Sequence, residues 1–224
     1  MIFADSGKVD HEGEKTLFGQ IRMQNKNQRP DMSNFKQNST DQNCWTVDFA
    51  GEGSMDYGGP FRDALVNICN ELESDALPLL IKTANNRSEV GTNRECYLLN
   101  PEANSPTHFE MFHYLGCILG FAIMSKSPIP LNLAPSVWKQ LLGDQMTLND
   151  LDCIDTLSAK ILKDLQGHSK TTASEEEFEM YSGSQNFVTV LSHGTEVPLC
   201  SDGFTKKVTR ENLPEYIRLV ILAR

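Results

Sequence analysis

The residues best suited to covalent or metal chemistry in this chain are its cysteines and histidines. His113 and Cys117 are four residues apart, which places them on one helical face, where they could share a zinc ion or act as a base and nucleophile. Zinc needs further ligands, and the nearest candidate, His108, points elsewhere. A reactive thiol needs an electropositive, part-exposed setting, whereas Cys117 lies in an apolar run. We therefore interpret the pair as core residues, and we predict no catalytic residue and no metal ligand.

The cysteines as a set favour reduced thiols over disulfide bonds. They include no C-x-x-C pair, and no apolar leader opens the chain, so we expect a cytoplasmic protein with free thiols. An independent cysteine hydrolase would require one thiol beside a base. The six positions are Cys44, Cys69, Cys96, Cys117, Cys153 and Cys200.

A glycine-rich segment could in principle cradle a phosphate. Gly51-Glu52-Gly53 begins like a dinucleotide fingerprint, but the third glycine of that fingerprint would fall at Asp56, whose carboxylate repels a pyrophosphate. We therefore expect a turn between a strand and a helix, and no cofactor.

Acidic residues could similarly bind calcium. Asp150, Asp152 and Asp155 lack the alternating ligands and central glycine of a calcium loop, so we interpret them as helix caps and surface charge. Glu175 to Glu177 form either an exposed acidic loop or the first turn of a helix.

Composition excludes two classes of partner. The 224 residues carry 20 basic and 30 acidic side chains, a formal net charge of -10, and a surface of that sign repels nucleic acid. The most apolar run, Met111 to Met124, is too short to span a bilayer, so we expect no membrane insertion.

The helices and strands expected from the sequence predict an α+β fold in which helices dominate. Residues 1–44 are polar and are expected to form a partly disordered tail with room for one short helix, whereas residues 45–224 carry the fold. Trp45 to Phe49 alternate like a strand, and a helix follows from Pro60. Short strands are expected at Leu79–Ile81 and Tyr97–Leu99.

The central part of the chain predicts a long buried helix. Thr107 and Glu110 have the spacing of a capping box, and the run from Phe109 to Met124 is apolar almost all round. Gly116 and Gly120 lie on one face and would allow a neighbouring backbone to approach closely.

Further elements are expected towards the carboxyl end. Pro135 begins a helix that Gly143 ends, and Asp155 caps an amphipathic segment. Strands at 187–191 and 196–199 precede a last helix, 211–222, capped by Thr209. A capping pair at Thr147 and Asp150 begins a short turn between the first two of these helices.

A glycine-rich pattern leads into the helix expected from Pro60, and it consists of Gly51, Glu52, Gly53, Asp56, Tyr57, Gly58, Gly59 and Arg62. This pattern resembles the opening signature of HECT domains, in which a strand and two glycine-rich turns lead into a helix. Further matches follow in family order, including Asn100-Pro101, Leu133-Ala134-Pro135 and Glu215-Tyr216, so the likeness spans roughly residues 16–224.

Several segments are most similar to the HERC branch, the giant ligases that pair a HECT domain with RCC1-like repeats. Asp63 and Cys117 depart from residues common in the family. Glu95 stands where some members carry an aromatic residue of a non-covalent ubiquitin site, so Glu95 and Tyr97 are the candidate ubiquitin contacts that the resemblance implies.

The resemblance implies a part of a ubiquitin ligase. HECT ligases take ubiquitin from a conjugating enzyme onto a cysteine and pass it to a substrate lysine. In the family, that cysteine and the docking surface for the conjugating enzyme follow the helix that matches Glu211–Leu222. We therefore expect an N-lobe scaffold, truncated before the docking subdomain and the C-lobe, with the rest of the HECT domain, ubiquitin and a conjugating enzyme as partners. The alternative is a catalytically inactive protein-interaction module.

Overall fold

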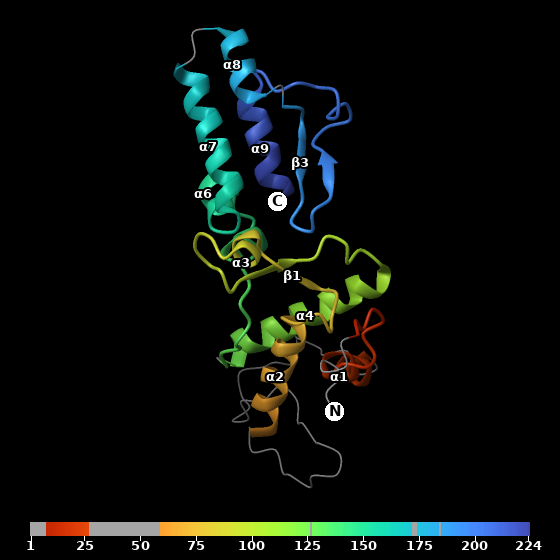
Figure 1. Ribbon diagram of the computed structural model, residues 1–224. Coiled ribbons are helices and arrows are strands. Elements are labelled where there is room, and N and C mark those ends of the chain that lie inside the picture. Colours follow the sequence, from red (N-terminus) through yellow and green to blue (C-terminus); the bar gives the residue numbers. More distant parts are fainter. Residues whose placement is uncertain (1–7, 27–58, 126, 172–173, 184) are drawn as a thin grey trace. The chain divides into compact units, whose positions relative to one another are not determined.

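The computed structural model describes residues 8–26, 59–125, 127–171, 174–183 and 185–224, which form two compact units (Figure 1). Unit 1 comprises Met1–Leu80 and Leu99–Leu131, and unit 2 comprises Ile81–Leu98 and Asn132–Arg224. Helices dominate the described residues and strands are few and short, which confirms the predicted α+β class. The predicted boundary at residue 44 lies outside the described ranges.

Unit 1 contains three of the described helices. These are α1 (Leu17–Lys26), α2 (Gly59–Leu72) and α4 (Pro106–Ser125). The sequence pattern of α2 places an apolar residue every three or four positions, and these side chains are all buried. The helix expected from Pro60 is therefore confirmed, and its apolar face is part of the core of the unit.

Two buried carboxylates anchor the start of α1. Glu71, at the end of α2, accepts hydrogen bonds from the backbone N–H groups of Leu17 at 2.8 Å and Phe18 at 2.9 Å. Asp10 accepts from the N–H groups of Lys15 at 2.7 Å and Thr16 at 2.9 Å. The first N–H groups of a helix have no partner within the helix, so Glu71 satisfies two of them, while Asp10 holds the two residues that precede α1.

A close contact between two glycines brings α1 against the loop before it. A Cβ atom added to Gly19 would lie 2.1 Å from the backbone oxygen of Gly13, a distance that no side chain tolerates. Gly13 itself has a φ of +62°, which favours glycine. On the same helix, the Arg22 guanidinium forms an ion pair with Glu110 of α4 at 3.1 Å.

The structure corrects three expectations about α4. The helix begins at Pro106, and its cap is Ser105, whose hydroxyl accepts from the N–H of His108 at 3.1 Å, instead of the predicted Thr107. The helix is also not buried all round, since Phe109 is 61% exposed and Ile123 is 73% exposed. Apart from the backbone of α4 itself and the two neighbouring residues, no heavy atom of the described residues lies within 4 Å of the position of a Cβ on Gly116, so the predicted close approach of a neighbouring backbone is not seen there.

Unit 2 combines short strands with the remaining described helices. β1 (Leu80–Lys82) pairs with β2 (Tyr97–Leu99), and the helix α3 (Ala84–Ser88) lies between them in the chain. The helices α5 (Pro135–Leu141), α6 (Leu148–Asp152) and α7 (Thr156–Thr171) follow, and then α8 (Glu175–Ser182). The strands β3 (Val188–Val190) and β4 (Glu196–Pro198) precede α9 (Leu213–Ala223).

Local sequence explains several boundaries in unit 2. Gly143 has a φ of +75° just after α5, and Thr147 and Asp150 form the capping box of α6. β3 and β4 pair antiparallel, with Thr189 opposite Val197. The acidic run Glu175–Glu177 forms the first turn of α8, capped by Ser174, so the helical alternative holds.

Packing within unit 2 joins its helices to the β3–β4 hairpin. α7 packs against α6 and α8, and α9 packs against α6 and β3 (Figure 1). The hydroxyl of Tyr216 in α9 donates to the backbone oxygen of Val188 at 3.2 Å. The apolar faces of α7 and α9 supply the buried residues of this unit, which include Leu162, Leu165, Ile217, Val220 and Ile221.

Candidate interaction site

Most of the signature residues singled out in the sequence lie outside the described ranges, namely Gly51, Glu52, Gly53, Asp56, Tyr57 and Gly58. The two that are described lie in the first turn of α2. Gly59 is its first residue, and Arg62, three residues later, is exposed.

Of the two candidate ubiquitin contacts, Tyr97 begins β2 and Glu95 lies in the turn before it. Glu95 is exposed, and Tyr97 is half-buried. The Tyr97 N–H donates to the oxygen of Asn132 at 2.8 Å, and its own oxygen accepts from the N–H of Ala134 at 2.9 Å. Cys96, between them, is buried, and its N–H donates to the oxygen of Asn93 at 3.2 Å, so Glu95 belongs to the turn that leads into β2.

The loop 89–95, which joins α3 to β2 and ends at Glu95, has an unusual backbone. Glu89 has a φ of +55° and Asn93 a φ of +52°, and Gly91 between them has a φ of +79°. For Glu89 this left-handed conformation costs roughly 1 kcal/mol or more, whereas asparagine adopts it more readily, so the loop persists only where surrounding contacts compensate for Glu89.

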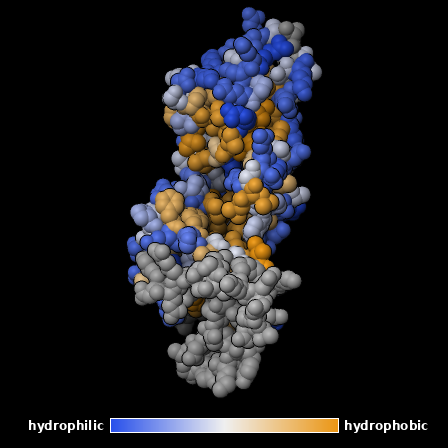
Figure 2. All heavy atoms as spheres, turned by 180° about the vertical axis from the view of Figure 1, so that it is seen from behind, coloured by the Kyte–Doolittle hydropathy of each residue, from blue (hydrophilic) through white to orange (hydrophobic). Residues whose placement is uncertain are grey.

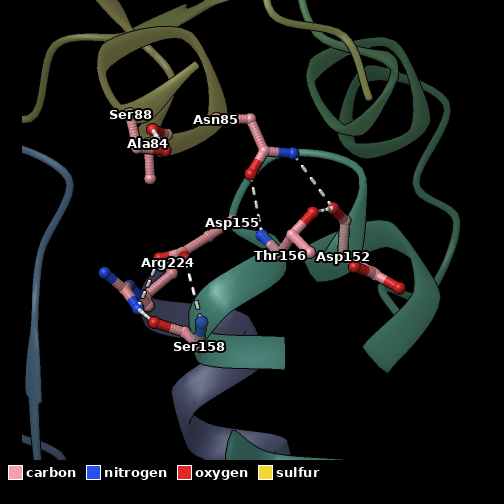
Figure 3. Close-up of polar contacts among 8 residues, drawn as sticks. All are labelled: Ala84, Asn85, Ser88, Asp152, Asp155, Thr156, Ser158 and Arg224. Atoms are coloured by element: carbon pink, nitrogen blue, oxygen red, sulfur yellow. Dashed lines mark hydrogen bonds and ion pairs between the residues drawn. The ribbon is translucent and has the colours of Figure 1, made fainter. Parts of the chain in front are cut away.

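The main compensation comes from Asn85 of α3, which is 1% exposed. Its Nδ2 donates to the backbone oxygens of Thr92 at 3.0 Å and Asp152 at 3.1 Å, and its Oδ1 accepts from the N–H of Thr156 at 2.8 Å. Figure 3 shows the contacts of the side chain with Asp152 and Thr156, at the junction of α6 and α7. The amide thus uses both donor hydrogens and its oxygen, which links the loop to that junction.

Two further contacts fix the loop against the same junction. Asn93 Nδ2 donates to the oxygen of Cys153 at 3.2 Å. A Cβ added to Gly91 would lie 2.1 Å from the hydroxyl oxygen of Thr156, so only glycine fits there. We call Asn85, Asn93 and the backbone groups that they bind the amide clamp.

A buried ion pair holds the other side of the α6–α7 junction. Arg224 Nη1 lies 2.7 Å from Asp155 Oδ2, and their side chains are 11% and 9% exposed. Asp155 also accepts from the N–H of Ser158 at 3.0 Å, which confirms its expected role as the cap of α7 (Figure 3). The same guanidinium donates to the Ser158 hydroxyl.

The described thiols are poorly placed for nucleophilic chemistry. Burial, reinforced by the charge of Glu73, raises the pKa of Cys69 to about 12. Burial also raises the pKa of Cys117, and desolvation and a contact with Asp202 raise that of Cys200. A thiol attacks as its thiolate, so none of these three is activated. No disulfide joins the five cysteines of the described part of the chain.

The described residues contain neither a cluster of side chains that could hold a metal ion nor a helix that could cross a membrane. The His113 Nδ1 and Cys117 Sγ atoms are 4.0 Å apart, and no group of three or more His, Cys, Asp or Glu side chains among the described residues could hold a metal ion. None of the helices in those ranges is both long enough and apolar enough to cross a membrane.

Comparison with known proteins defines the class. A family model described as HECT-domain (ubiquitin-transferase) matches residues 66–224, so the chain belongs to the HECT-domain family. The predicted family is confirmed.

The chain is similar to individual ligases of this family. It is 38% identical over 217 residues to E3 ubiquitin-protein ligase HERC2 of Mus musculus and of Homo sapiens, which covers 96% of this chain and 4% of each relative. It is 32% identical over 188 residues to probable E3 ubiquitin-protein ligase HECTD4 of Homo sapiens, which covers 77% of this chain and 5% of that relative. The predicted HERC-like character is confirmed, and the chain spans only a few per cent of the length of these relatives.

The sequence analysis missed the amide clamp. Asn85 and Asn93 look like loop residues in the sequence, because asparagine favours turns and caps. The only available signal was the glycine at 91 between polar residues, which predicts a turn but not its attachment to residues 152–156.

Proposed function

We propose that this chain is the first part of the N-lobe of a HECT-type ubiquitin ligase and serves there as a scaffold. The match of the HECT family model to residues 66–224 carries the proposal. In the reaction, the thiolate of the ligase attacks the thioester between ubiquitin and the conjugating enzyme and releases that enzyme's thiol. A substrate lysine then attacks the new thioester, forms an amide and releases the thiol of the ligase.

The catalytic cysteine belongs, in this proposal, to a part of the HECT domain that this chain does not carry. The raised pKa values of Cys69, Cys117 and Cys200 support this assignment, because each thiol stays protonated near neutral pH. The partners of the scaffold are the rest of the HECT domain and, through it, a conjugating enzyme. The absence of disulfides among the described cysteines supports a cytoplasmic location.

The test is a thioester assay with the full chain, activating enzyme, a panel of conjugating enzymes, ATP and labelled ubiquitin, run on non-reducing gels. We expect no reductant-sensitive adduct between the chain and ubiquitin. An adduct that disappears when one cysteine is changed to Ala would identify a nucleophile in this chain and overturn the scaffold assignment.

The proposed contact with ubiquitin lies at Glu95 and Tyr97, which are two residues apart at the end of the loop 89–95 and the start of β2. Titration of the isotope-labelled chain with ubiquitin should shift the amide signals of both residues. Glu95→Ala should weaken binding, whereas the control Glu211→Ala, which removes another exposed carboxylate, should not. Equal affinities of the two variants would contradict the assignment.

A second candidate is a module that associates with a further copy of itself. Figure 2 shows hydrophobic residues gathered on one face at the level of α7 and α9. Leu157 and Ile161 of α7 are 55% and 60% exposed, and Leu222 of α9 is 58% exposed. Exposed apolar surface favours association, so light scattering of a concentration series should detect dimers, and Ile161→Lys should weaken them. A monomer at all concentrations would exclude this candidate.

A further inference from the structure

We propose that Asn85 is a positioning residue that holds the loop 89–95 in the conformation in which Glu95 meets ubiquitin. This inference rests on the proposed ubiquitin contact and adds the residue that shapes it. Asn85 is buried and cannot touch ubiquitin, so it acts through the loop that it binds.

Polar contacts, instead of apolar packing, determine the conformation of this loop. Every residue from Arg87 to Glu95 is exposed or half-buried, so no side chain of the loop is part of the core. The contribution of hydrophobic burial to holding this loop is therefore small. The hydrogen bonds of Asn85 to Thr92, Asp152 and Thr156 take its place.

The strain of the loop shows that the clamp selects one conformation. Glu89 would leave the left-handed region if the loop were released, because other backbone conformations are cheaper for its side chain, whereas the asparagine at 93 adopts that region more readily. One strained residue, opposed by an amide with both donor hydrogens in use, indicates a loop that is held in place.

A held loop favours binding because its conformational entropy is lost before the partner arrives. Fixing a backbone costs conformational entropy, and a released loop would lose that freedom at the moment of binding. The clamp thus makes exposed Arg94 and Glu95 a ready surface next to Tyr97.

The experiment uses the full isotope-labelled chain with four variants. They are Asn85→Ala, Asn93→Ala, the double variant Asn85→Ala with Glu89→Gly, and the control Asn149→Ala, which removes an exposed amide from α6. Amide hydrogen exchange of residues 89–96 reports loop order without ubiquitin, and titration with ubiquitin gives the affinity.

We expect Asn85→Ala to speed exchange in the loop by about tenfold or more and to weaken ubiquitin binding several-fold. Asn149→Ala should change neither. Adding Glu89→Gly should restore part of both properties, because glycine adopts the left-handed conformation at the end of α3 without strain. Both measurements are made at a temperature at which thermal unfolding shows each variant to be fully folded, so a general loss of stability cannot account for weaker binding.

Three results would overturn the inference. One is unchanged exchange of the loop in Asn85→Ala, and another is faster exchange with unchanged ubiquitin affinity. If Asn85→Ala does not fold, Asn93→Ala decides by the same two measurements, since it removes the bond to Cys153 and places alanine at a φ of +52°, and both changes release the loop. Failure of the wild-type chain to bind ubiquitin is the third result, and it is distinct because it overturns the proposed contact at Glu95 and the positioning role with it.

Discussion

Removal of the Glu71 carboxylate should detach the start of α1 from unit 1. This side chain is 1% exposed and accepts from the N–H groups of Leu17 and Phe18. In Glu71→Ala both N–H groups lose their partner, at a cost of about 1–3 kcal/mol each where they are buried. We expect this loss to dominate the stability of α1.

A smaller effect opposes it. Burial, the largest cause, raises the pKa of Glu71, against the N–H groups of Phe18 and Leu17, which favour the ionised form. The charged carboxylate is therefore costly to bury, and its removal offsets part of the loss. We expect a net destabilisation of about 2–4 kcal/mol for Glu71→Ala and about 1–2 kcal/mol for Glu71→Gln, which keeps one acceptor oxygen and the volume of the side chain.

Native-state hydrogen exchange measures the effect locally. A change of about 2–4 kcal/mol corresponds to a loss of protection in α1 of roughly 30- to 800-fold. The control Asn70→Ala removes an exposed side chain from the preceding position of α2 and should change protection less than about threefold. Protection of α1 in Glu71→Ala that matches the control would refute the reasoning.

Gly19→Ala should destabilise unit 1 by about 3 kcal/mol or more, because its Cβ would lie 2.1 Å from a backbone oxygen. Gly116→Ala, with open space at its Cβ, should instead stabilise α4 by about 0.5–1 kcal/mol, and urea unfolding compares the two variants. Asp155→Ala should cost about 2–4 kcal/mol by the same measurement, because it leaves the Arg224 guanidinium buried without its carboxylate and removes a cap, and an unchanged midpoint would contradict this. Burial alone would raise the pKa of Asp10, but hydrogen bonds from backbone N–H groups outweigh burial and lower that pKa. The stability that the Asp10 carboxylate contributes is therefore present above its unfolded pKa and is lost as the pH falls through the lower folded value. A thermal-stability profile from pH 5 to about 2 should lose this slope in Asp10→Asn.

Helices with a clear apolar period were predictable from the sequence. The spacing of Phe61, Ala64 and Ile68 predicts the buried face of α2, and the proline at 135 predicts the start of α5. These features depend on residues close together in the chain, which a sequence displays directly.

The features that the sequence did not reveal depend on distant partners. Ser105 competes with Thr107 as the cap of α4, and the reciprocal contact with His108 decides between them. The exposed face of α4 was unpredictable because its apolar composition is the same whether or not a neighbour covers it. Of the candidate site, Glu95 and Tyr97 were named from resemblance, whereas Asn85 acts across 67 to 71 residues of sequence.

The interleaving of the two units has a consequence for synthesis on the ribosome. Unit 1 needs Leu99–Leu131, which is translated after Ile81–Leu98, the first segment of unit 2. The nascent chain therefore carries β1 and α3 through the completion of unit 1 before the remaining residues of unit 2 exist. At about 5–20 residues per second, the 93 residues from 132 to 224 take roughly 5–20 s to appear. Until residues 152–156 have been made early in that interval, Asn85 lacks the backbone groups that it binds at the α6–α7 junction, so the loop 89–95 reaches its final conformation only after unit 1 has all its residues.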